Sequence, residues 1–387
     1  MFFFVGNESP LKALNKVHDR LYLDDGWAST VISGEMVWYK GYSTDCTLSD
    51  DIATIVSHGF RPAGKWCAIV CDNNDYEIMH PPLRGFPLYE REDSKTNLQL
   101  EGYIPDGHAY RPTITGQSTI TLEQASTFIG DILLENTINF LKYNKIDEMN
   151  VLCSAGLDST TSWAVLDSVT KDYTLHAYIP KDNDKLFREY MGVTREYESD
   201  LLDKISQDYW GYSMMSGFKK PSWYLTGYYA EVIQYRDGMA INALANYQGK
   251  KIQELCSETD YLYHFLHRPN IVEQYKDSML VFENDQELKD YLYGTIFGDW
   301  QMWHVDNNMT FSPFADIRIP KTMSRLSIED ITKNSVSGLI QREIIKRFKP
   351  ELLSLVSEYK NSKDTYGNFR QNFKNITLDP HVRVKIR

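Results

Sequence analysis

The chain has little cysteine, and its few cysteines are scattered. Five of its 387 residues are cysteine, and of these only Cys67 and Cys71 lie close together in the sequence. A secreted disulfide scaffold would carry an even and denser set, and a zinc site would bring more ligands at tighter spacing. We therefore expect buried free thiols and no metal site built on cysteine.

Long apolar runs and secretion signals are also missing. No stretch of about 18 consecutive apolar residues occurs, so we expect no membrane-spanning helix and no membrane partner. The chain begins Met-Phe-Phe-Phe-Val, which is too short and too uncharged to be a signal peptide. These two absences predict a cytoplasmic protein.

Positive charge is in deficit. There are 41 Lys and Arg against 53 Asp and Glu, which gives a formal net charge of −12. A general nucleic-acid surface needs clustered cations to neutralise phosphates, so we expect no nucleic-acid partner. A small neutral or zwitterionic substrate suits this charge better. The length and the 42% of apolar residues allow two domains, each with its own core.

Residues 1–120 predict an α+β domain built on antiparallel sheet. Turn residues separate short strand-like runs at 2–5, 28–32, 36–39, 66–71 and 76–79. Short helices are predicted at 10–20 and 49–58. The stretch 101–118 is rich in proline and glycine and predicts a linker.

Residues 121–387 predict a second domain of a different kind. Helix and strand patterns alternate along 122–143, 150–153, 160–169 and 174–179, in that order and beginning with a helix. Strands that alternate with helices predict an α/β fold with a parallel, doubly wound sheet. Two final helices are expected over 337–348 and 351–359.

A loop of small and hydroxyl residues joins the predicted strand 150–153 to the next helix. Its members are Ser154, Ala155, Gly156, Leu157, Asp158 and Ser159. The start of a helix offers unpaired backbone N–H groups and the positive end of a dipole to phosphate. The serine hydroxyls add donors, glycine lets the backbone approach an oxygen atom, and Asp158 can hold a Mg2+ ion that bridges phosphates. The loop therefore predicts a site for the pyrophosphate part of ATP, with Mg2+.

No lysine follows this loop, so it is not of the Walker type. The alternative is an ordinary strand-to-helix turn capped by serine and aspartate, which needs these residue types but not the whole pattern S-x-G-x-D-S. The loop resembles the PP-loop of N-type ATP pyrophosphatases, whose usual form is S-G-G-x-D-S; here Ala155 replaces the first glycine. Within that superfamily the chain most resembles glutamine-dependent asparagine synthetases and their relatives, the β-lactam synthetases. The resemblance implies a parallel-sheet PP-loop ATP pyrophosphatase domain over 121–387, preceded by a degenerate, N-terminal-nucleophile-like glutaminase domain over 1–120.

The N-terminal domain carries this resemblance in weaker form. Segments 38–42 and 64–70 resemble strands of the glutaminase domain, and 83–89 resembles its R-D-x-x-G-x-x-P-L-Y-Y turn without the first half. Such a glutaminase needs a cysteine at the first mature residue, where the free α-amine serves as its base. Met1 is followed by phenylalanines and the first cysteine is Cys46, so we expect no glutaminase activity. The resemblance implies a structural platform, with recruitment of a substrate or partner as the alternative.

A second loop of the family, S-G-E-G-S-D-E, is matched from Ser257 to Asp260, with one residue fewer between the acidic positions and without the glycines. The resemblance implies that Glu258 handles the proton of the amine and that Asp260 is the second Mg2+ ligand. The alternative is a helix start capped by Ser257, with both acidic residues in its first turn.

Two segments nearer the end of the chain complete the resemblance. The segment from Phe311 to Asp316 resembles the V-P-F-L-D segment, which in the family lies near the reacting carboxylate and helps to close the site. Lys360, with Lys363 as the alternate, stands where the family has its essential lysine, although the flanking Arg and Phe are absent. A lysine there would stabilise the charge that develops on pyrophosphate. The alternative is a pair of solvated surface lysines.

The resemblance implies an AMP-forming carbon–nitrogen ligase. A carboxylate attacks the α-phosphate of ATP, pyrophosphate leaves, and ammonia or another amine attacks the acyl-adenylate. We expect an ammonia-dependent asparagine synthetase with aspartate as the acid. The alternatives are an amide ligase for a different carboxylate, like β-lactam synthetase, and a catalytically inactive nucleotide-binding protein. A homo-oligomer is compatible with the sequence.

Overall fold

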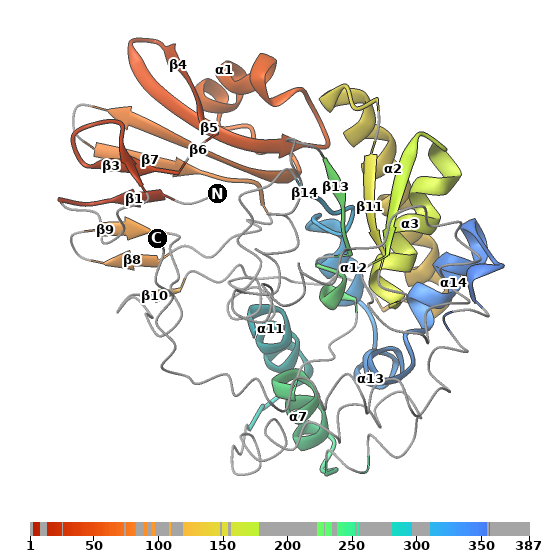
Figure 1. The fold of residues 1–387 in the computed structure, drawn as a ribbon. Coiled ribbons are helices and arrows are strands. Elements are labelled where there is room, and N and C mark those ends of the chain that lie inside the picture. The colour runs from red at the N-terminus through yellow and green to blue at the C-terminus, as the bar shows by residue number, and fades with distance from the viewer. Residues whose placement is uncertain are drawn as a thin grey trace, which may run out of the picture.

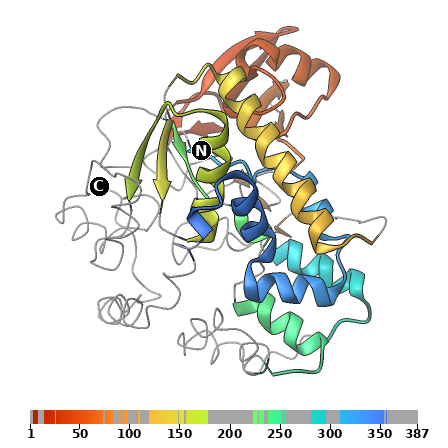
Figure 2. The same cartoon turned by 90° about the vertical axis from the view of Figure 1, so that its right-hand side faces the viewer.

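Figures 1 and 2 show the structure, a computed structural model, in two views. It describes residues 3–7, 14–24, 26–72, 75–82, 89–91, 94–96, 108–109, 119–147, 149–153, 156–177, 223–227, 229–233, 238–251, 254, 281–295, 310–353 and 356. Two antiparallel sheets from the first part of the chain stand beside a parallel sheet and its helices from the later part (Figure 1).

The first part of the chain forms two antiparallel sheets. One sheet has the strand order β4-β5-β6-β7, with bounds Ala28–Ile32, Glu35–Ser43, Gly64–Asp72 and Asp75–Met79. The other has the order β10-β8-β9-β1-β3-β2, with bounds His108–Ala109, Tyr89–Arg91, Ser94–Thr96, Phe3–Val5, Leu21–Leu23 and Asn15–Lys16. The five strands predicted in this part of the chain, as short runs between turn residues, are therefore present.

The two antiparallel sheets share an apolar layer. Phe3 and Leu21 of the second sheet pack with Trp38 and Ile69 of the first, and all four side chains are buried. Because side chains alternate across a strand, the neighbours of these residues face the other way. On that other face, Trp66 of β6 packs under Ile55 of helix α1 (Leu48–His58).

The later part of the chain forms a four-stranded parallel sheet. Its order is β12-β11-β13-β14, with bounds Tyr173–Ala177, Met149–Cys153, Tyr224–Leu225 and Thr310–Phe311. All three neighbouring pairs are parallel, and helix α3 (Leu157–Val169) connects β11 to β12. A mixed α/β fold with antiparallel sheets followed by a parallel sheet is thus confirmed. Parallel strands end at one edge, so the segments after β11, β13 and β14 meet there.

Helices pack beside this sheet. The long helix α2 (Leu122–Asn144), α3 and α14 (Leu339–Phe348) contact one another and share a core with β11 (Figures 1 and 2). A second apolar cluster joins them to the short helix η2 and to α7, α11, α12 and α13, with bounds Ala230–Val232, Gly238–Tyr247, Asp285–Thr295, Arg318–Met323 and Ile328–Ser337. Among the described helices, none is long and apolar enough to cross a membrane.

Tyr42 at the end of β5 joins the antiparallel sheets to the later part of the chain. Its buried ring lies edge-on to Phe140, Phe311 and Trp223, at centroid distances of 5.1, 5.5 and 5.7 Å. Close by, the amide of Asn144 donates to the Ser43 carbonyl at 3.1 Å. We call these four rings the aromatic nest.

Three details of the sequence-based fold need correction. The helix predicted over 10–20 is wrong in its described part, because Asn15 and Lys16 form strand β2 and pair with β3. The predicted linker 101–118 contains β10, which pairs with β8. The helix expected over 337–348 is present as α14 but begins two residues later, because Ser337 ends α13 and Gly338, with a φ of 64°, separates the two helices in a left-handed conformation.

Candidate functional site

The candidate site begins where β11 turns into α3. Gly156 is the N-cap of α3, with extended backbone and no side-chain cap, whereas Thr121 and Gln124 form a capping box at the start of α2. The amides of the first helical turn have no acceptor within their own helix. Ser159 is buried, and its hydroxyl lies 3.4 Å from the Gly156 carbonyl, to which it donates. This helix start suits an oxygen-rich anion.

Of the six predicted loop residues, the structure describes four. Gly156, Leu157, Asp158 and Ser159 form the N-cap and first turn of α3, so the helix starts earlier than the predicted residue 160. Ser154 and Ala155 lie outside the described residues. The same holds for Glu258, Asp260, Lys360 and Lys363, whose predicted roles stay predictions.

The carboxylate of Asp158 is held by a residue from a distant part of the chain. Gln341 of α14 donates its side-chain amide to Asp158 Oδ1 at 2.7 Å. Gln341 is fully buried, at 0% exposure, whereas Asp158 is partly exposed. A half-buried carboxylate at the start of a helix, restrained by a buried amide, has the ligand chemistry that Mg2+ prefers.

The segment after β13 packs directly on the start of α3. A Cβ atom added at Gly227 would lie 2.6 Å from both the Asp158 carbonyl carbon and the Ser159 nitrogen. Real Cβ contacts are never this short, so glycine is required for the approach. The Ser162 hydroxyl fastens the same contact by donating to the Thr226 carbonyl at 3.0 Å. The carboxyl ends of β11 and β13 thus meet at Asp158, as a parallel sheet requires.

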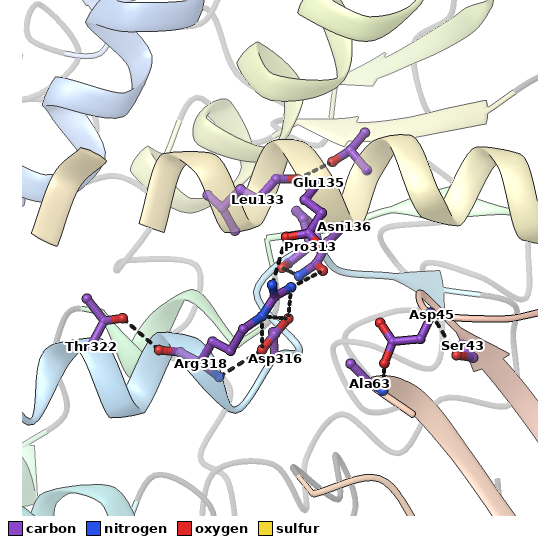
Figure 3. Close-up of polar contacts among 11 residues, drawn as sticks. Ser43, Asp45, Ala63, Leu133, Glu135, Asn136, Pro313, Asp316, Arg318 and Thr322 are labelled. Atoms are coloured by element: carbon purple, nitrogen blue, oxygen red, sulfur yellow. Dashed lines mark hydrogen bonds and ion pairs between the residues drawn. The ribbon is translucent and has the colours of Figure 1, made fainter. Parts of the chain in front are cut away.

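Asp316, which follows β14, has a buried carboxylate that forms an ion pair with the partly exposed Arg318. Its carboxylate is 1% exposed, and one carboxylate oxygen lies 2.7 Å from Arg318 Nη2. Hydrogen bonds from the Arg318 guanidinium to Asp316 and Glu135 hold the pKa of the guanidinium above its ordinary value. Arg318 also bonds Glu135 at 2.7 Å and the side-chain oxygen of Asn136 at 3.2 Å, both on α2 (Figure 3). The Asn136 amide donates to the Pro313 carbonyl at 2.9 Å. The segment predicted to help close the site is therefore fastened to α2, and Asp316 forms part of that fastening.

The cysteines that the structure describes in side-chain detail are free thiols. Cys67 and Cys71 are buried in β6, and Cys46 is half-buried. Burial raises the pKa of the Cys67 thiol, which keeps it protonated. The prediction of buried free thiols is confirmed for Cys67 and Cys71. In the described part of the chain, no group of three His, Cys, Asp or Glu side chains has the arrangement of a metal site.

Sequence reasoning missed two residues of the site. Gly227 lies two residues after β13, and a glycine close to the end of a strand of a parallel sheet is a signal for close backbone approach. Gln341 lies among Ile340, Ile344 and Ile345 on the buried side of α14, so the signal was a polar residue on an apolar helix face. Neither pattern indicates Asp158 as the partner, because 183 residues separate Gln341 from it.

Comparison of the chain with known protein families and with curated proteins finds no match. The functional conclusion therefore depends on the loop, on its position in the fold and on the physical chemistry of its neighbours.

Proposed function

We propose that the chain is an ATP-dependent, AMP-forming amide ligase with a PP-loop ATP pyrophosphatase domain behind an N-terminal-nucleophile-like domain. The observation that carries the proposal is the start of α3: the S-x-G-x-D-S loop follows a parallel strand, and Gly156 begins the helix without a side-chain cap. Strand, glycine turn and helix start are the elements from which proteins build phosphate sites at the carboxyl edge of a parallel sheet.

The residues present fit ATP and Mg2+. The first-turn amides of α3 would bind phosphate oxygens, and Asp158 would bind Mg2+, which supplies positive charge against the leaving pyrophosphate. Gly227 brings a second backbone segment against the same turn, and this fixes the position of the Asp158 backbone. The buried Gln341 amide lies against the carboxylate itself. Both contacts hold the predicted metal ligand before ATP binds, and such preorganisation favours binding.

The substrates proposed are a small carboxylic acid, with aspartate first, and ammonia or another amine. The carboxylate oxygen attacks the α-phosphate of ATP, the bond from that phosphate to pyrophosphate breaks, and the amine then displaces AMP from the acyl-adenylate. Glu258 is the proposed acceptor of the amine proton, Asp260 a second Mg2+ ligand, and Lys360 the proposed cation for pyrophosphate. An ammonia-dependent asparagine synthetase is the leading form of this proposal.

A screen of acids and amines tests it. The full chain is incubated with ATP, Mg2+, single amino acids or other carboxylates, and ammonium or amines, while AMP and pyrophosphate are measured. Release of both products with aspartate and ammonium supports an asparagine synthetase. Release only with another acid supports an amide ligase of the β-lactam-synthetase kind, and ATP binding without release with any pair supports an inactive nucleotide-binding protein.

Two matched variants connect the activity to the site. Asp158→Asn removes the charge of the proposed Mg2+ ligand and is expected to lower pyrophosphate release by at least about 100-fold. Asp172→Asn makes the same chemical change at an exposed residue next to the start of β12, at the opposite edge of the sheet, and should leave the rate unchanged. Full activity in Asp158→Asn would contradict the metal assignment.

A further inference from the structure

Only one of the two polar groups of the Gln341 side chain has a hydrogen-bond partner in the described part of the chain. Its amide nitrogen donates to Asp158 Oδ1, whereas its Oε1 atom is buried and has no hydrogen-bond donor among the described residues. An ionised carboxylate only accepts hydrogen bonds, so the nitrogen must face Asp158. Reversing the amide would set two acceptors against each other. The oxygen is therefore left as a buried acceptor, a feature that native proteins rarely keep without a reason.

The backbone around Gln341 is firmly fixed. The preceding residue, Ile340, donates its amide to the side-chain oxygen of Asn334 at 2.9 Å, and the amide of Asn334 donates to the Ile233 carbonyl at 2.6 Å. Asn334 is itself 0% exposed. The start of α14 is thus tied to α13 and to the end of η2. Because the backbone at the start of α14 is fixed in this way, the Gln341 side chain can hold the Asp158 carboxylate in one orientation.

We propose that Gln341 is a positioning residue for Mg–ATP. By holding Oδ1 it sets the plane of the Asp158 carboxylate, and an Oε1 atom without a donor among the described residues is the cost of turning the amide nitrogen toward that carboxylate. The inference rests on the proposed function, since it assigns Asp158 to Mg2+. It adds a residue of α14 to a site otherwise built from the loops that follow β11 and β13. Gln341 acts through Asp158 and does not take part in the chemical step.

Binding of ATP by the full chain, measured by titration calorimetry with Mg2+ and again with EDTA, tests the inference. Gln341→Met removes the amide at nearly constant length, and we expect the dissociation constant of Mg–ATP to rise about tenfold. Binding of ATP in EDTA should change less than about threefold, because the metal is absent. In an Asp158→Asn background, Gln341→Met should have no further effect on Mg–ATP binding, since the group that it positions is already changed.

A matched control separates positioning from general damage. Gln248→Met removes another partly buried glutamine amide, which donates to Thr332 Oγ1 at 2.6 Å, and it should leave both affinities unchanged. Gln341→Asn keeps the amide but shortens its reach, so it should reproduce the selective loss of Mg–ATP affinity even if the methionine variant does not fold.

Three outcomes would overturn the inference. Equal weakening of ATP binding with and without Mg2+ would show a merely structural role, and so would an undiminished effect of Gln341→Met in the Asp158→Asn background. Wild-type Mg–ATP affinity in Gln341→Met would refute the inference while leaving the proposed function intact. Failure of the wild-type chain to bind Mg–ATP at all would refute both.

Discussion

The hydroxyl of Tyr42 and the backbone of Ser312 are joined by a reciprocal contact across 270 positions of the chain. The Ser312 amide donates to the Tyr42 oxygen at 3.3 Å, and the hydroxyl donates to the Ser312 carbonyl at 3.4 Å. Burial raises the pKa of Tyr42, so the hydroxyl keeps its proton. Ser312 directly follows β14 and belongs to the segment that Asp316 and Arg318 fasten to α2. The antiparallel sheets therefore help to place a loop at the carboxyl edge of the parallel sheet.

Removing the Tyr42 hydroxyl should weaken the contact between the antiparallel sheets and the segment after β14. We expect Tyr42→Phe to lower the free energy of unfolding by about 1 kcal/mol, since the ring still fills the nest but its hydrogen bonds are lost. Urea unfolding at constant pH measures the effect. Tyr22→Phe is the control, because the Tyr22 hydroxyl donates to Asn7 at the surface and should cost less than about 0.5 kcal/mol. Equal losses in the two variants would contradict a buried role for the Tyr42 hydroxyl.

Gly227 should tolerate no side chain. The Cβ of Gly227→Ala would meet backbone atoms of Asp158 and Ser159 at 2.6 Å, so α3 or β13 must shift. We expect a loss of about 1–3 kcal/mol in unfolding free energy and weaker Mg–ATP binding. Gly130→Ala provides the contrast: its Cβ would meet a flexible guanidinium at 3.2 Å, and alanine favours the helix. Gly130→Ala should be neutral or stabilising, and equal damage at both positions would argue against a special role for Gly227.

The ion pair of Asp316 should contribute to stability although Arg318 is partly exposed. Arg318→Met leaves a carboxylate that is 1% exposed without its cation. Loss of one partner of a fully buried pair costs about 3–5 kcal/mol, and the 42% exposure of Arg318 lowers our expectation to about 2 kcal/mol. Lys333→Met breaks a pair with Glu329 that is exposed on both sides and should cost much less. Thermal and urea unfolding of the two variants would separate these values, and a similar small loss in both would contradict the structural role.

The carboxyl of Asp167 makes the free energy of unfolding depend on pH in the acidic range. Burial raises the pKa of this carboxyl, but hydrogen bonds from Lys171, Lys349 and Tyr173 outweigh burial and hold the pKa below its ordinary value. A depressed pKa contributes stability that is present above the unfolded value of about 3.9 and is lost as pH falls through the folded value. We therefore expect unfolding free energy to decline below about pH 4.

Lys349→Met tests the source of this acid sensitivity. The Lys349 ammonium lies 2.8 Å from Asp167 and is 15% exposed, so its loss should cost about 1–2 kcal/mol at pH 7 and less near pH 2, where the carboxyl is protonated. Lys346→Met, which breaks an exposed pair with Glu343, should leave the pH dependence unchanged. Parallel pH profiles for Lys349→Met and the wild type would show that Lys349 does not set the pKa of Asp167.

The sequence predicted those strands and helices whose residue pattern along the chain matches the side chains that are buried in the structure. Strand β4 was predicted with its observed bounds, and β6 and α2 with nearly observed bounds, because turn residues bound the two strand-like runs and helical spacing of apolar residues runs through α2. The helix expected over 10–20 is wrong because Asn15 and Lys16 are extended and pair with β3. Their strand conformation comes from this tertiary pairing and not from a local propensity. Helix α13 went unpredicted, although Ser327 caps it by accepting from the Asp330 amide and could have indicated its start.

For the candidate site, the sequence could predict the loop but not what surrounds it. Gly156 and Asp158 are recognisable because strand, turn and helix are contiguous in the chain. Their contacts with Gly227 and Gln341 arise only when β13 and α14 come to lie beside α3. Such neighbours follow from topology, and no spacing of residues encodes them.

The aromatic nest has a consequence for how the two parts of the chain depend on each other. The Tyr42 ring enters a pocket of three rings, of which Phe140 and Phe311 are stacked at a centroid distance of 3.9 Å. In interfaces between separate proteins, an aromatic side chain buried in such a pocket often contributes much of the binding energy. The Tyr42 ring therefore ties the antiparallel sheets to the apolar cluster that Phe140 and Phe311 form beside the parallel sheet. Without Tyr42, the rings of Phe140, Trp223 and Phe311 would be an uncovered apolar surface, so we expect the later part of the chain to self-associate when it is separated from the antiparallel sheets.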